Sequence, residues 1–416
     1  MRYAKLLICI LCAVAITLAS TVFKIEGGSE QLVRVAIAAP ELSSGAKSAL
    51  FESSGDMTVV LSGLRFKCRR LKITSGSALS LEAYDQSGTL TTTKKASAAI
   101  IEGRLTLDGI AYDGYFEVSL LGGQIKIVNI LPLEDYVKGV MPYEIGSNQH
   151  DEITKASSIM IRTVALHKKH SEYGFDVCAT SCCQNYKGHK ISDERLDRIA
   201  ESTKGIVLTY EGEPISCAYC NSNGGASCPS SDAWGGSPVP YLSSVVLDEG
   251  EFADVWQVTM TAHEINERAA AKGAKGAITD ISLERSEAGF VKRVVLTDTT
   301  GKQIIVEDTS KVRKLFGLKS ARFDISYYLS GDILTSDGLK DTAVSVITSD
   351  GVVEIDTIHL PAEGESEYTV NVVFDGSGHG HCVGFSLAGA KMLVRRGYKY
   401  EAIATFYFPG AELSRI

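Results

Sequence analysis

The residue best suited to chemistry in this sequence is Glu144, a lone carboxyl group that is followed by Ile145 and preceded by the apolar and aromatic segment Met141-Pro142-Tyr143. Desolvation by such neighbours can keep a carboxyl group protonated near neutral pH. A protonated carboxyl group can act as a general acid and, once it has given up its proton, as a general base. An exposed loop glutamate is the commoner arrangement for a lone carboxylate, so the residue pattern alone leaves both interpretations open.

A second candidate site is a group of cysteines that fall within about fifty residues of one another: Cys178, Cys182, Cys183, Cys217, Cys220 and Cys228. Thiolates at such spacing can bind a tetrahedral Zn²⁺ ion. The same thiols can also pair as disulfides if the chain is exported. Two nearby histidines, His167 and His170, are separated by two lysines, and we interpret them as the solvated end of a helix and not as metal ligands.

The clearest helix is predicted over residues 151–173, which carry Arg162 near their middle. Apolar residues recur there at helical spacing, and Asp151 suits the first turn of a helix. Arg162 is then a solvated residue, a buried ion-pair partner or a clamp for a ligand. An adjacent acidic pair, Glu134 and Asp135, is predicted to cap or solvate a short preceding helix, because adjacent helical residues do not face one site.

Strands dominate the rest of the sequence, and the predicted fold class is α+β. From residue 32 to about residue 130, short runs alternate apolar and polar residues, as in antiparallel sheets. Further strands are predicted around residues 214–246 and up to about residue 373. Thr261 and Glu264 match a capping box before an Ala-rich helix, and Ser386 matches an N-cap.

The composition is that of a globular protein and excludes several function classes. Of the 416 residues, 44% are hydrophobic and 22% are charged, which is typical of folded domains. The formal net charge of −8 argues against a nucleic-acid-binding protein, which needs a basic surface. The sequence contains neither a His-Glu-x-x-His zinc-protease motif nor a phosphate-binding P-loop.

The N-terminus predicts export. Residues 6–23 are uncharged, are preceded by Arg2 and Lys5, and would span roughly 27 Å as a helix. We interpret residues 1–24 as an uncleaved membrane anchor, and a cleaved signal peptide is the alternative. In both cases the positive flank stays in the cytoplasm. The expected location is therefore the cell membrane, with a single span and an extracytoplasmic body.

Several short motifs follow one another along most of the chain: Leu131-Pro-Leu-Glu-Asp-Tyr-Val-Lys-Gly-Val, Pro142-Tyr-Glu144, Arg162-Thr163, Cys183-Gln184-Asn-Tyr186-Lys-Gly188, Gly224-Gly225, Trp234-Gly-Gly236, Gly380-His381, Gly389-Ala390 and Tyr407-Phe-Pro-Gly410. Together they resemble the family of stage II sporulation protein D and the related amidase enhancers, over roughly residues 32–414. The resemblance implies a lytic transglycosylase that cuts peptidoglycan glycan strands freed of their stem peptides. It also implies a peptidoglycan amidase as partner during engulfment in sporulation.

The resemblance places the catalytic acid and base at Glu144. One carboxyl group protonates the glycosidic oxygen and then takes the proton of the muramyl 6-hydroxyl as this oxygen attacks the anomeric carbon, which leaves a 1,6-anhydro-muramic acid end. A non-catalytic wall-binding module that enhances an amidase is the alternative function. The resemblance further implies substrate contacts at Arg162, Gln184, Tyr186, His381 and Ser386.

The resemblance also favours a metal site over disulfides. Relatives carry His where this chain has Cys182 and Cys220, and Cys is itself a zinc ligand. We therefore expect Cys178, Cys182, Cys183 and Cys220 to hold a structural zinc ion, with Cys217 as the alternative to Cys182. The expected segments are the anchor at 1–24, a β-rich part at 30–130, a catalytic core at 131–245, a β-rich insertion at 246–365 and residues 366–416, which complete the core.

Overall fold

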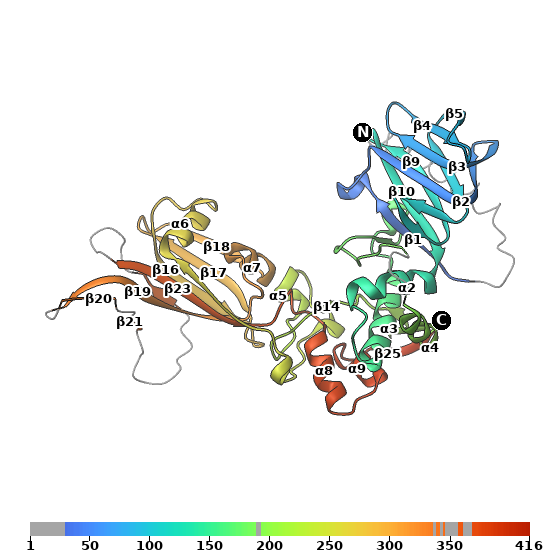
Figure 1. The fold of residues 1–416 in the computed structure, drawn as a ribbon. Coiled ribbons are helices and arrows are strands. Elements are labelled where there is room, and N and C mark those ends of the chain that lie inside the picture. The colour runs from blue at the N-terminus through green and yellow to red at the C-terminus, as the bar shows by residue number, and fades with distance from the viewer. Residues whose placement is uncertain (1–29, 189–192, 336–337, 342–343, 346–356, 361–367) are drawn as a thin grey trace.

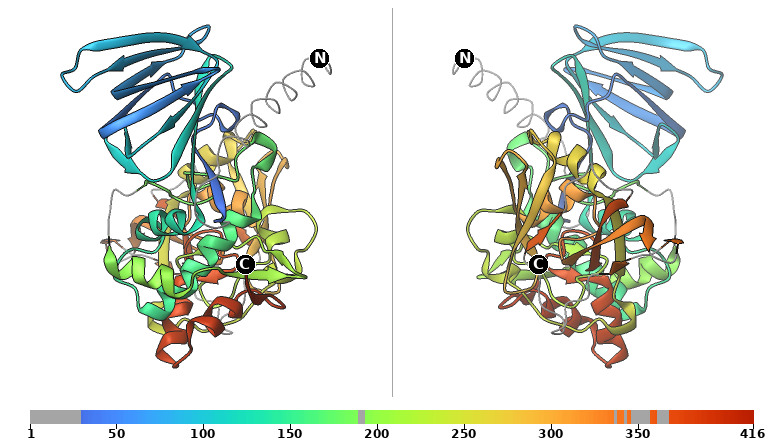
Figure 2. Two further views of the ribbon diagram at one scale, coloured as in Figure 1. Left: turned by 90° about the vertical axis from the view of Figure 1, so that its right-hand side faces the viewer. Right: turned by 90° about the vertical axis from the view of Figure 1, so that its left-hand side faces the viewer.

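The computed structural model describes residues 30–188, 193–335, 338–341, 344–345, 357–360 and 368–416. The anchor predicted at residues 1–24 lies outside them. Among the described residues, no helix is both long enough and apolar enough to cross a membrane. The ribbon separates into an N-terminal sheet, a central group of helices and a second lobe built from sheets (Figure 1, Figure 2).

The fold is α+β and rich in strands, as predicted. The helices of the described residues are α2 (Leu133–Glu144), α3 (Asp151–His167), α4 (Glu194–Ser202), α5 (Ser230–Trp234), α6 (Ala262–Ala270), α7 (Thr309–Phe316), α8 (Leu387–Arg395) and α9 (Tyr400–Phe406). Short 3-10 helices are η1 (Pro40–Leu42), η2 (Ser171–Tyr173), η3 (Pro240–Leu242) and η4 (Gly250–Phe252).

The N-terminal sheet has the strand order β11-β1-β10-β9-β6-β2-β3-β4-β5, with β7 and β8 paired beside β2. Its neighbours are antiparallel except for β1 and β11, which are parallel. Its strands are β1 (Leu32–Ala38), β2 (Ser48–Leu61), β3 (Leu64–Thr74), β4 (Leu79–Tyr84), β5 (Leu90–Ala96), β6 (Ala98–Glu102), β7 (Leu105–Leu107), β8 (Ile110–Tyr112), β9 (Tyr115–Leu121), β10 (Gln124–Pro132) and β11 (Val177–Cys178).

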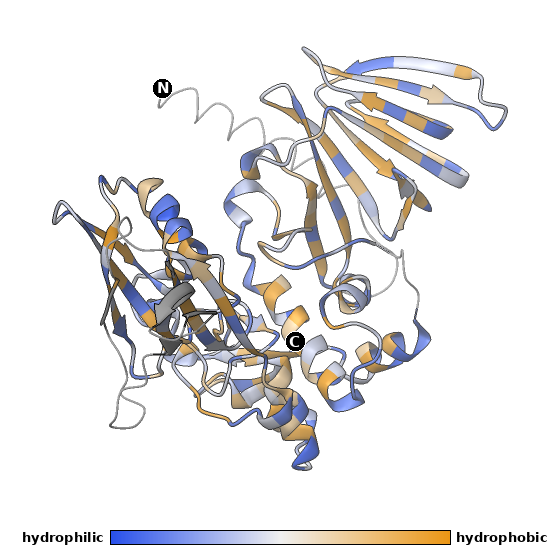
Figure 3. Cartoon of the chain, turned by 60° about the vertical axis from the view of Figure 1, so that its left-hand side comes forward, coloured by the Kyte–Doolittle hydropathy of each residue, from blue (hydrophilic) through white to orange (hydrophobic). Residues whose placement is uncertain are grey.

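Alternating apolar and polar residues explain this sheet, and Figure 3 shows the alternation as bands along its strands. In β10, Ile125 and Ile127 are buried, whereas Gln124 and Lys126 are partly exposed. The buried face of the sheet joins the apolar side of α2 in one hydrophobic cluster. The sheet fixes the start of α2, because β10 ends at Pro132 and the helix begins at the next residue.

Helix α3 is buried along most of its length and links two cores. Ile161 packs in the cluster of the N-terminal sheet and α2, whereas Ile153 and Met160 pack in a second cluster with α8 and α9. The helix ends at His167 and not at residue 173 as predicted. Lys168 adopts a left-handed conformation (φ 52°) that stops the helix there.

The second lobe, residues 255–377, contains two sheets with the strand orders β15-β23-β19-β20 and β18-β17-β16-β22, and β21 pairs with β19. Helix α6 begins at the predicted capping box, in which Thr261 and Glu264 bond each other's backbone. The strands are β15 (Val255–Thr261), β16 (Ile278–Arg285), β17 (Val291–Asp298), β18 (Gln303–Glu307), β19 (Phe323–Thr335), β20 (Gly338–Asp341), β21 (Val344–Ser345), β22 (Thr357–His359) and β23 (Tyr368–Ser377).

After β23 the chain returns to the central body and completes it. Strand β24 (Phe385–Ser386) pairs in parallel with β14 (Tyr219–Cys220). Strand β25 (Glu412–Arg415) pairs with β12 (Ile206–Tyr210), which also pairs with β13 (Glu213–Pro214). Segments on either side of the second lobe in the sequence therefore form one body.

Two further predictions of secondary structure are wrong. Residues 214–246, predicted to be β-rich, are mostly loops, and residues with positive φ such as Gly224 and Gly225 interrupt regular structure there. Helix α7 lies in a stretch predicted to form strands. Its ends are capped, because Asp308 accepts from the backbone N–H of Lys311 at 2.7 Å and Gly317 takes the left-handed position that follows the helix.

Candidate functional site

Glu144 is the last residue of α2 and is half-buried beside a cavity of about 240 Å³. The walls of this cavity come from α2, α3, β14, β24 and the segment that follows β23. Tyr219 and His381 are among the lining residues. Glu144 is the only carboxyl residue among the described residues that line the cavity.

Three donors hold the Glu144 carboxylate. The backbone N–H of Asn185 and its Nδ2 donate to Oε1 over 2.6 and 2.8 Å, and the Tyr219 hydroxyl donates to Oε2 over 2.6 Å. Of the apolar sequence neighbours that were expected to surround Glu144, only Ile145 lines the cavity. The polar partners come from positions 41 and 75 residues further along the chain. Hydrogen bonds to a charged acceptor are short and directional, so they fix the carboxyl group in place.

A further layer of side chains holds these donors. Gln184 is fully buried; it accepts from the Tyr136 hydroxyl at 2.9 Å, and its Nε2 lies 3.5 Å from the Tyr219 oxygen. Burial, and then the charge of Glu144, raises the pKa of Tyr219 well above its usual value, so Tyr219 keeps its proton at physiological pH. Gln184 does not line the cavity. We therefore correct its predicted role from substrate contact to support of Tyr219.

Two histidines line the same cavity. The ring of His381, a predicted substrate contact, lies 5.3 Å from the ring of Trp234 between centroids. Burial, and then the charge of Arg313, lowers the pKa of His381 to about 4. Its imidazole is therefore neutral near pH 7 and can take part in hydrogen bonds without adding charge to the cavity. The second histidine, His379, contacts Asp254 through Nδ1 at 2.9 Å.

Arg162 lies in the interior and does not reach the cavity. Its side chain is 0% exposed and forms a double contact with Glu134, from Nε to Oε1 at 2.9 Å and from Nη2 to Oε2 at 2.7 Å. Nη1 donates to the carbonyl of Ile206 at 2.9 Å. Its predicted substrate contact is therefore corrected to a buried ion pair. Glu134, predicted to cap or solvate its helix, is 8% exposed and joins α2 to α3 through this pair.

The Arg162→Met substitution is expected to lower the free energy of unfolding by about 3–5 kcal/mol, because it leaves Glu134 buried without its partner. Arg395→Met is a matched control, since Arg395 and Glu251 are both about 60% exposed and their pair contributes about 1 kcal/mol or less. Urea denaturation measures both. Equal losses of unfolding free energy in the two variants would show that the buried pair contributes no more to stability than the exposed pair.

Tyr186 and Ser386 also lie behind the cavity. Tyr186 is 2% exposed, and its hydroxyl donates to Oδ1 of Asn129 at 2.9 Å. Ser386 is fully buried, donates to Glu249 and accepts from the backbone N–H of Gly389 at 3.1 Å. The N-cap prediction for Ser386 is therefore confirmed. We correct the substrate contacts predicted at both positions, because neither side chain is accessible to a polymer.

Four residues form a cluster that could hold a metal ion: His170, Cys178, Cys182 and Cys183. One ligand atom from each lies within 4.8 Å of all the others. The Cys182 sulfur is 3.5 Å from Nε2 of His170, which is 6% exposed. Sulfur and imidazole nitrogen form the ligand set of soft, tetrahedral metal sites, so the chemistry of the donors fits a bound metal.

The cluster differs from the predicted metal site in one residue. Cys220 lies on β14, lines the cavity beside Glu144 and directs its thiol to Oδ1 of Asn223 at 2.9 Å. The fourth group of the cluster is His170, which the sequence analysis assigned to a solvated helix end. The left-handed turn at Lys168 ends α3 and lets His170 enter the interior.

The electrostatics of the cluster suit metal binding. A hydrogen bond between the two thiols lowers the pKa of Cys178 and raises that of Cys183, so Cys178 is the group that ionises first. A thiolate is the form that binds metals. The cluster directly precedes Gln184 and Asn185 in the chain. Whatever fixes the cluster therefore also fixes the donors that hold Glu144.

Comparisons with known proteins match this part of the chain. The model of the SpoIID family, described as stage II sporulation protein, matches residues 121–210. These residues contain Glu144, Asn185 and the whole cluster that could hold a metal ion. Asn185 and Tyr219, which contact Glu144 directly, were not predicted as site residues, and Tyr219 lies outside the matched range.

Three relatives are similar over most of the chain. An amidase enhancer of Bacillus subtilis (strain 168) is 29% identical over 83% of this chain and 49% of its own length, so the chain spans about half of that relative. An uncharacterised protein of Brachyspira hyodysenteriae is 25% identical over 74% of this chain and 73% of its own length. Stage II sporulation protein D of Bacillus subtilis (strain 168) is 24% identical over 69% of this chain and 76% of its own length. Residues 121–210 thus match the SpoIID family model, and most of the chain is similar to an amidase enhancer and to stage II sporulation protein D.

Proposed function

We propose that the protein is a lytic transglycosylase that cuts peptidoglycan glycan strands freed of their stem peptides, with Glu144 as acid and base. The observation that carries the proposal is a cavity whose described lining holds one carboxyl residue, fixed by Asn185 and Tyr219. Hydrolysis by an ordinary glycosidase uses a second carboxylate to activate water or form a covalent intermediate. Intramolecular attack by a sugar hydroxyl removes that requirement.

The contacts of Glu144 support a proton that is carried on Oε2. Oε1 accepts two N–H groups of Asn185, and neither group can turn into an acceptor. The Tyr219 hydroxyl can donate to Oε2 when Glu144 is ionised and accept from it when Glu144 is protonated. Tyr219 is thus the partner that can follow both states of an acid and base.

The reaction balances without water. Glu144 gives its proton to the glycosidic oxygen as the bond from this oxygen to the anomeric carbon of muramic acid breaks. The muramyl 6-hydroxyl oxygen then bonds to the same carbon, and its proton returns to Glu144. One product carries a new hydroxyl group, and the other ends in 1,6-anhydro-muramic acid.

We also propose that the cluster of His170, Cys178, Cys182 and Cys183 holds zinc in a structural role. Three cysteines and one histidine form a standard closed zinc site, and such a site supplies folding energy and not a reactive position. Its sequence neighbour Asn185 contacts Glu144, so the metal would support the alignment of the carboxyl group. The proton transfers themselves use only groups of the protein and the sugar.

The cellular setting follows from the same proposal. A membrane anchor at the N-terminus would place the body outside the cytoplasm, where peptidoglycan lies. The name of the sporulation relative supports a role in sporulation. We propose that this role is engulfment, beside an amidase that removes the stem peptides. The second candidate function is a non-catalytic amidase enhancer, which the name of the 29% identical relative favours.

Analysis of the product ends tests the reaction type. Purified protein incubated with peptide-free glycan strands is expected to release fragments with 1,6-anhydro ends, detected by mass spectrometry. Reducing muramic acid ends that take up oxygen-18 from water would exclude the lytic reaction. No cleavage, together with faster release of stem peptides by an added amidase, would instead support the enhancer function.

A further inference from the structure

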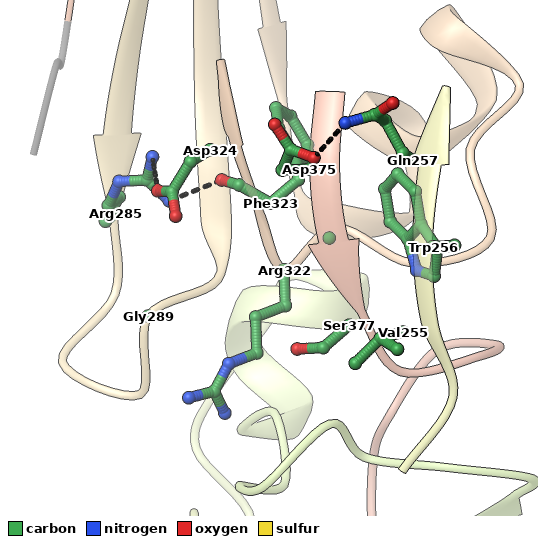
Figure 4. Close-up of a pocket in the computed structure, with 11 residues that line it drawn as sticks. Val255, Trp256, Gln257, Arg285, Gly289, Arg322, Phe323, Asp324, Asp375 and Ser377 are labelled. Atoms are coloured by element: carbon green, nitrogen blue, oxygen red, sulfur yellow. Dashed lines mark hydrogen bonds and ion pairs between the residues drawn. The ribbon is translucent and has the colours of Figure 1, made fainter. Parts of the chain in front are cut away.

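A second cavity, of about 680 Å³, lies on the second lobe where β15, β23 and the start of β19 run side by side (Figure 4). Strand register places Gln257, Asp375 and Asp324 in one row across these strands. Trp256 and Phe323, which alternate with that row, are buried in the core of the lobe. The row therefore lies on the opposite, open face of the sheet and forms a polar groove.

The acidic groups of this groove already have partners. Nη2 of Arg285 contacts Oδ1 of Asp324 at 2.8 Å, and Gln257 donates to Asp375 at 2.7 Å. Figure 4 shows both contacts as dashed lines. Because its carboxylates are paired in this way, the groove is not a site built for a cation.

Arg322 is the cationic group of the groove that lacks an acceptor. Its Nη1 is buried and forms no hydrogen bond with the described residues. Ser320 Oγ accepts from the backbone N–H of Arg322 at 3.2 Å, and Ser377 N–H donates to its carbonyl at 3.0 Å. The guanidinium carbon lies 5.9 Å from the ring centre of Phe290. The backbone of Arg322 is thus held in position. Its Nη1 has no hydrogen-bond partner among the described residues, and a buried N–H group is costly to leave unpaired.

Two glycines lie beside the guanidinium, and neither carries a side chain that could extend over it. A Cβ at Gly225 would lie 3.8 Å from Nη1 of Arg322, and one at Gly289 would lie 3.9 Å from Nε. Both positions have positive φ, at 105° and 81°, which favours glycine. A larger side chain at either position would extend over the group. The Gly224-Gly225 motif therefore borders the groove as well as the junction between the second lobe and the central body.

The groove adjoins the cavity of Glu144. Ser377 lines the groove and His379 lines the cavity, with only Gly378 between them. The Cα atoms of residues 377 and 379 are thus at most about 7 Å apart. Asp254 holds the junction, since it contacts both His379 and Lys319. A polymer with a reactive bond at Glu144 could therefore pass from one site into the other.

We propose that this groove binds the glycan next to the cleaved bond and that Arg322 recognises the free lactyl carboxylate of muramic acid. The proposal rests on the proposed function, which supplies the glycan. Removal of a stem peptide converts a neutral amide on the lactyl group into a carboxylate. A guanidinium group binds a carboxylate through two parallel hydrogen bonds, which a neutral amide cannot match. Arg322 thus makes the protein selective for stripped strands.

Binding measurements test the selectivity separately from cleavage. Protein with Glu144→Gln is titrated calorimetrically with a peptide-free glycan oligomer and with the same oligomer after its lactyl carboxylates are converted to methylamides. We expect the acid oligomer to bind about tenfold more tightly or better. Arg322→Gln should remove this difference without weakening the methylamide oligomer, and Arg322→Lys should retain part of it. Arg293→Gln is the matched control, because Arg293 lies in the same lobe, is 39% exposed and pairs with Glu284 and Glu307.

The proposal would be overturned by equal affinity for the two oligomers, by an unchanged preference after Arg322→Gln, or by equal weakening of both oligomers by that variant. Preferential binding of a free stem peptide through Arg322 would assign the groove to a different carboxylate and would also overturn it. Failure of the proposed function has a separate signature. The protein with intact Glu144 would then release no anhydro ends, whatever the two oligomers show.

Discussion

The Glu144→Gln substitution is expected to reduce cleavage of peptide-free glycan by at least about 10²–10⁴-fold while the thermal unfolding midpoint changes little. Glutamine preserves the shape of the side chain and an oxygen that can accept from Asn185. It carries no ionisable proton, so neither the donation to the glycosidic oxygen nor the later return can occur. Quantification of anhydro ends by mass spectrometry, with calorimetry of the same sample, measures both effects.

Glu213→Gln serves as the matched control for this change, because Glu213 is exposed on β13 and is not among the residues that line the cavity. It should leave cleavage and the unfolding midpoint unaltered. A large fall in the midpoint of Glu144→Gln would mark Glu144 as a structural residue whose bonds to Asn185 and Tyr219 hold α2 in place. Full activity of that variant would remove Glu144 from the reaction.

Local patterns in the sequence were sufficient to predict several elements. Alternation over β9 and β10 predicts two strands because side chains alternate between a buried and an open face. The capping box at Thr261 and the N-cap at Ser386 are confirmed, because both depend on residues within three positions of the helix start. The short helix predicted before Glu144 also forms, as α2, and Glu144 is its last residue.

Contacts between distant segments could not be predicted in the same way. Arg162 and Glu134 are 28 residues apart, and Tyr219 lies 75 residues beyond Glu144, so no local period records either pair. The substrate contacts predicted at Arg162, Tyr186 and Ser386 failed for a common reason. Each has a side chain able to bind sugar, but burial within the body decides that it pairs with protein groups instead.

The cluster of His170, Cys178, Cys182 and Cys183 depends both on a local sequence pattern and on contacts between distant segments. The sequence indicates Cys178, Cys182 and Cys183, since they are close neighbours with ligand chemistry. It does not indicate that the chain turns at Lys168 and brings His170 to these cysteines. Nor does it indicate that Cys220, on β14, lies in the cavity of Glu144. The division into segments and the membrane anchor stay predictions, and the latter lies outside the described residues.

The second large effect is expected on the zinc content and thermal stability of the protein when the proposed ligands are replaced or the metal is removed. Protein purified without added metal should contain about one zinc per chain, and a strong chelator should remove it and lower the unfolding midpoint by roughly 10 °C. His170→Ala and Cys178→Ser should lose the metal, because each removes one of four converging ligands. Cys220→Ser should keep it, since its thiol faces Asn223 and lies in the cavity of Glu144.

Elemental analysis of these three variants separates the ligand set of the structure from the set expected from the sequence. Loss of zinc in Cys220→Ser with retention in His170→Ala would restore the set expected from the sequence. Absence of zinc from the unaltered protein, with disulfide-linked peptides joining Cys178, Cys182 or Cys183 in a nonreducing digest, would replace the metal by disulfides. Chelation should also lower cleavage, because the segment that follows the cluster carries Asn185 and its two bonds to Glu144. Added magnesium should restore neither property, since thiolate and imidazole ligands are poorly matched to that hard ion.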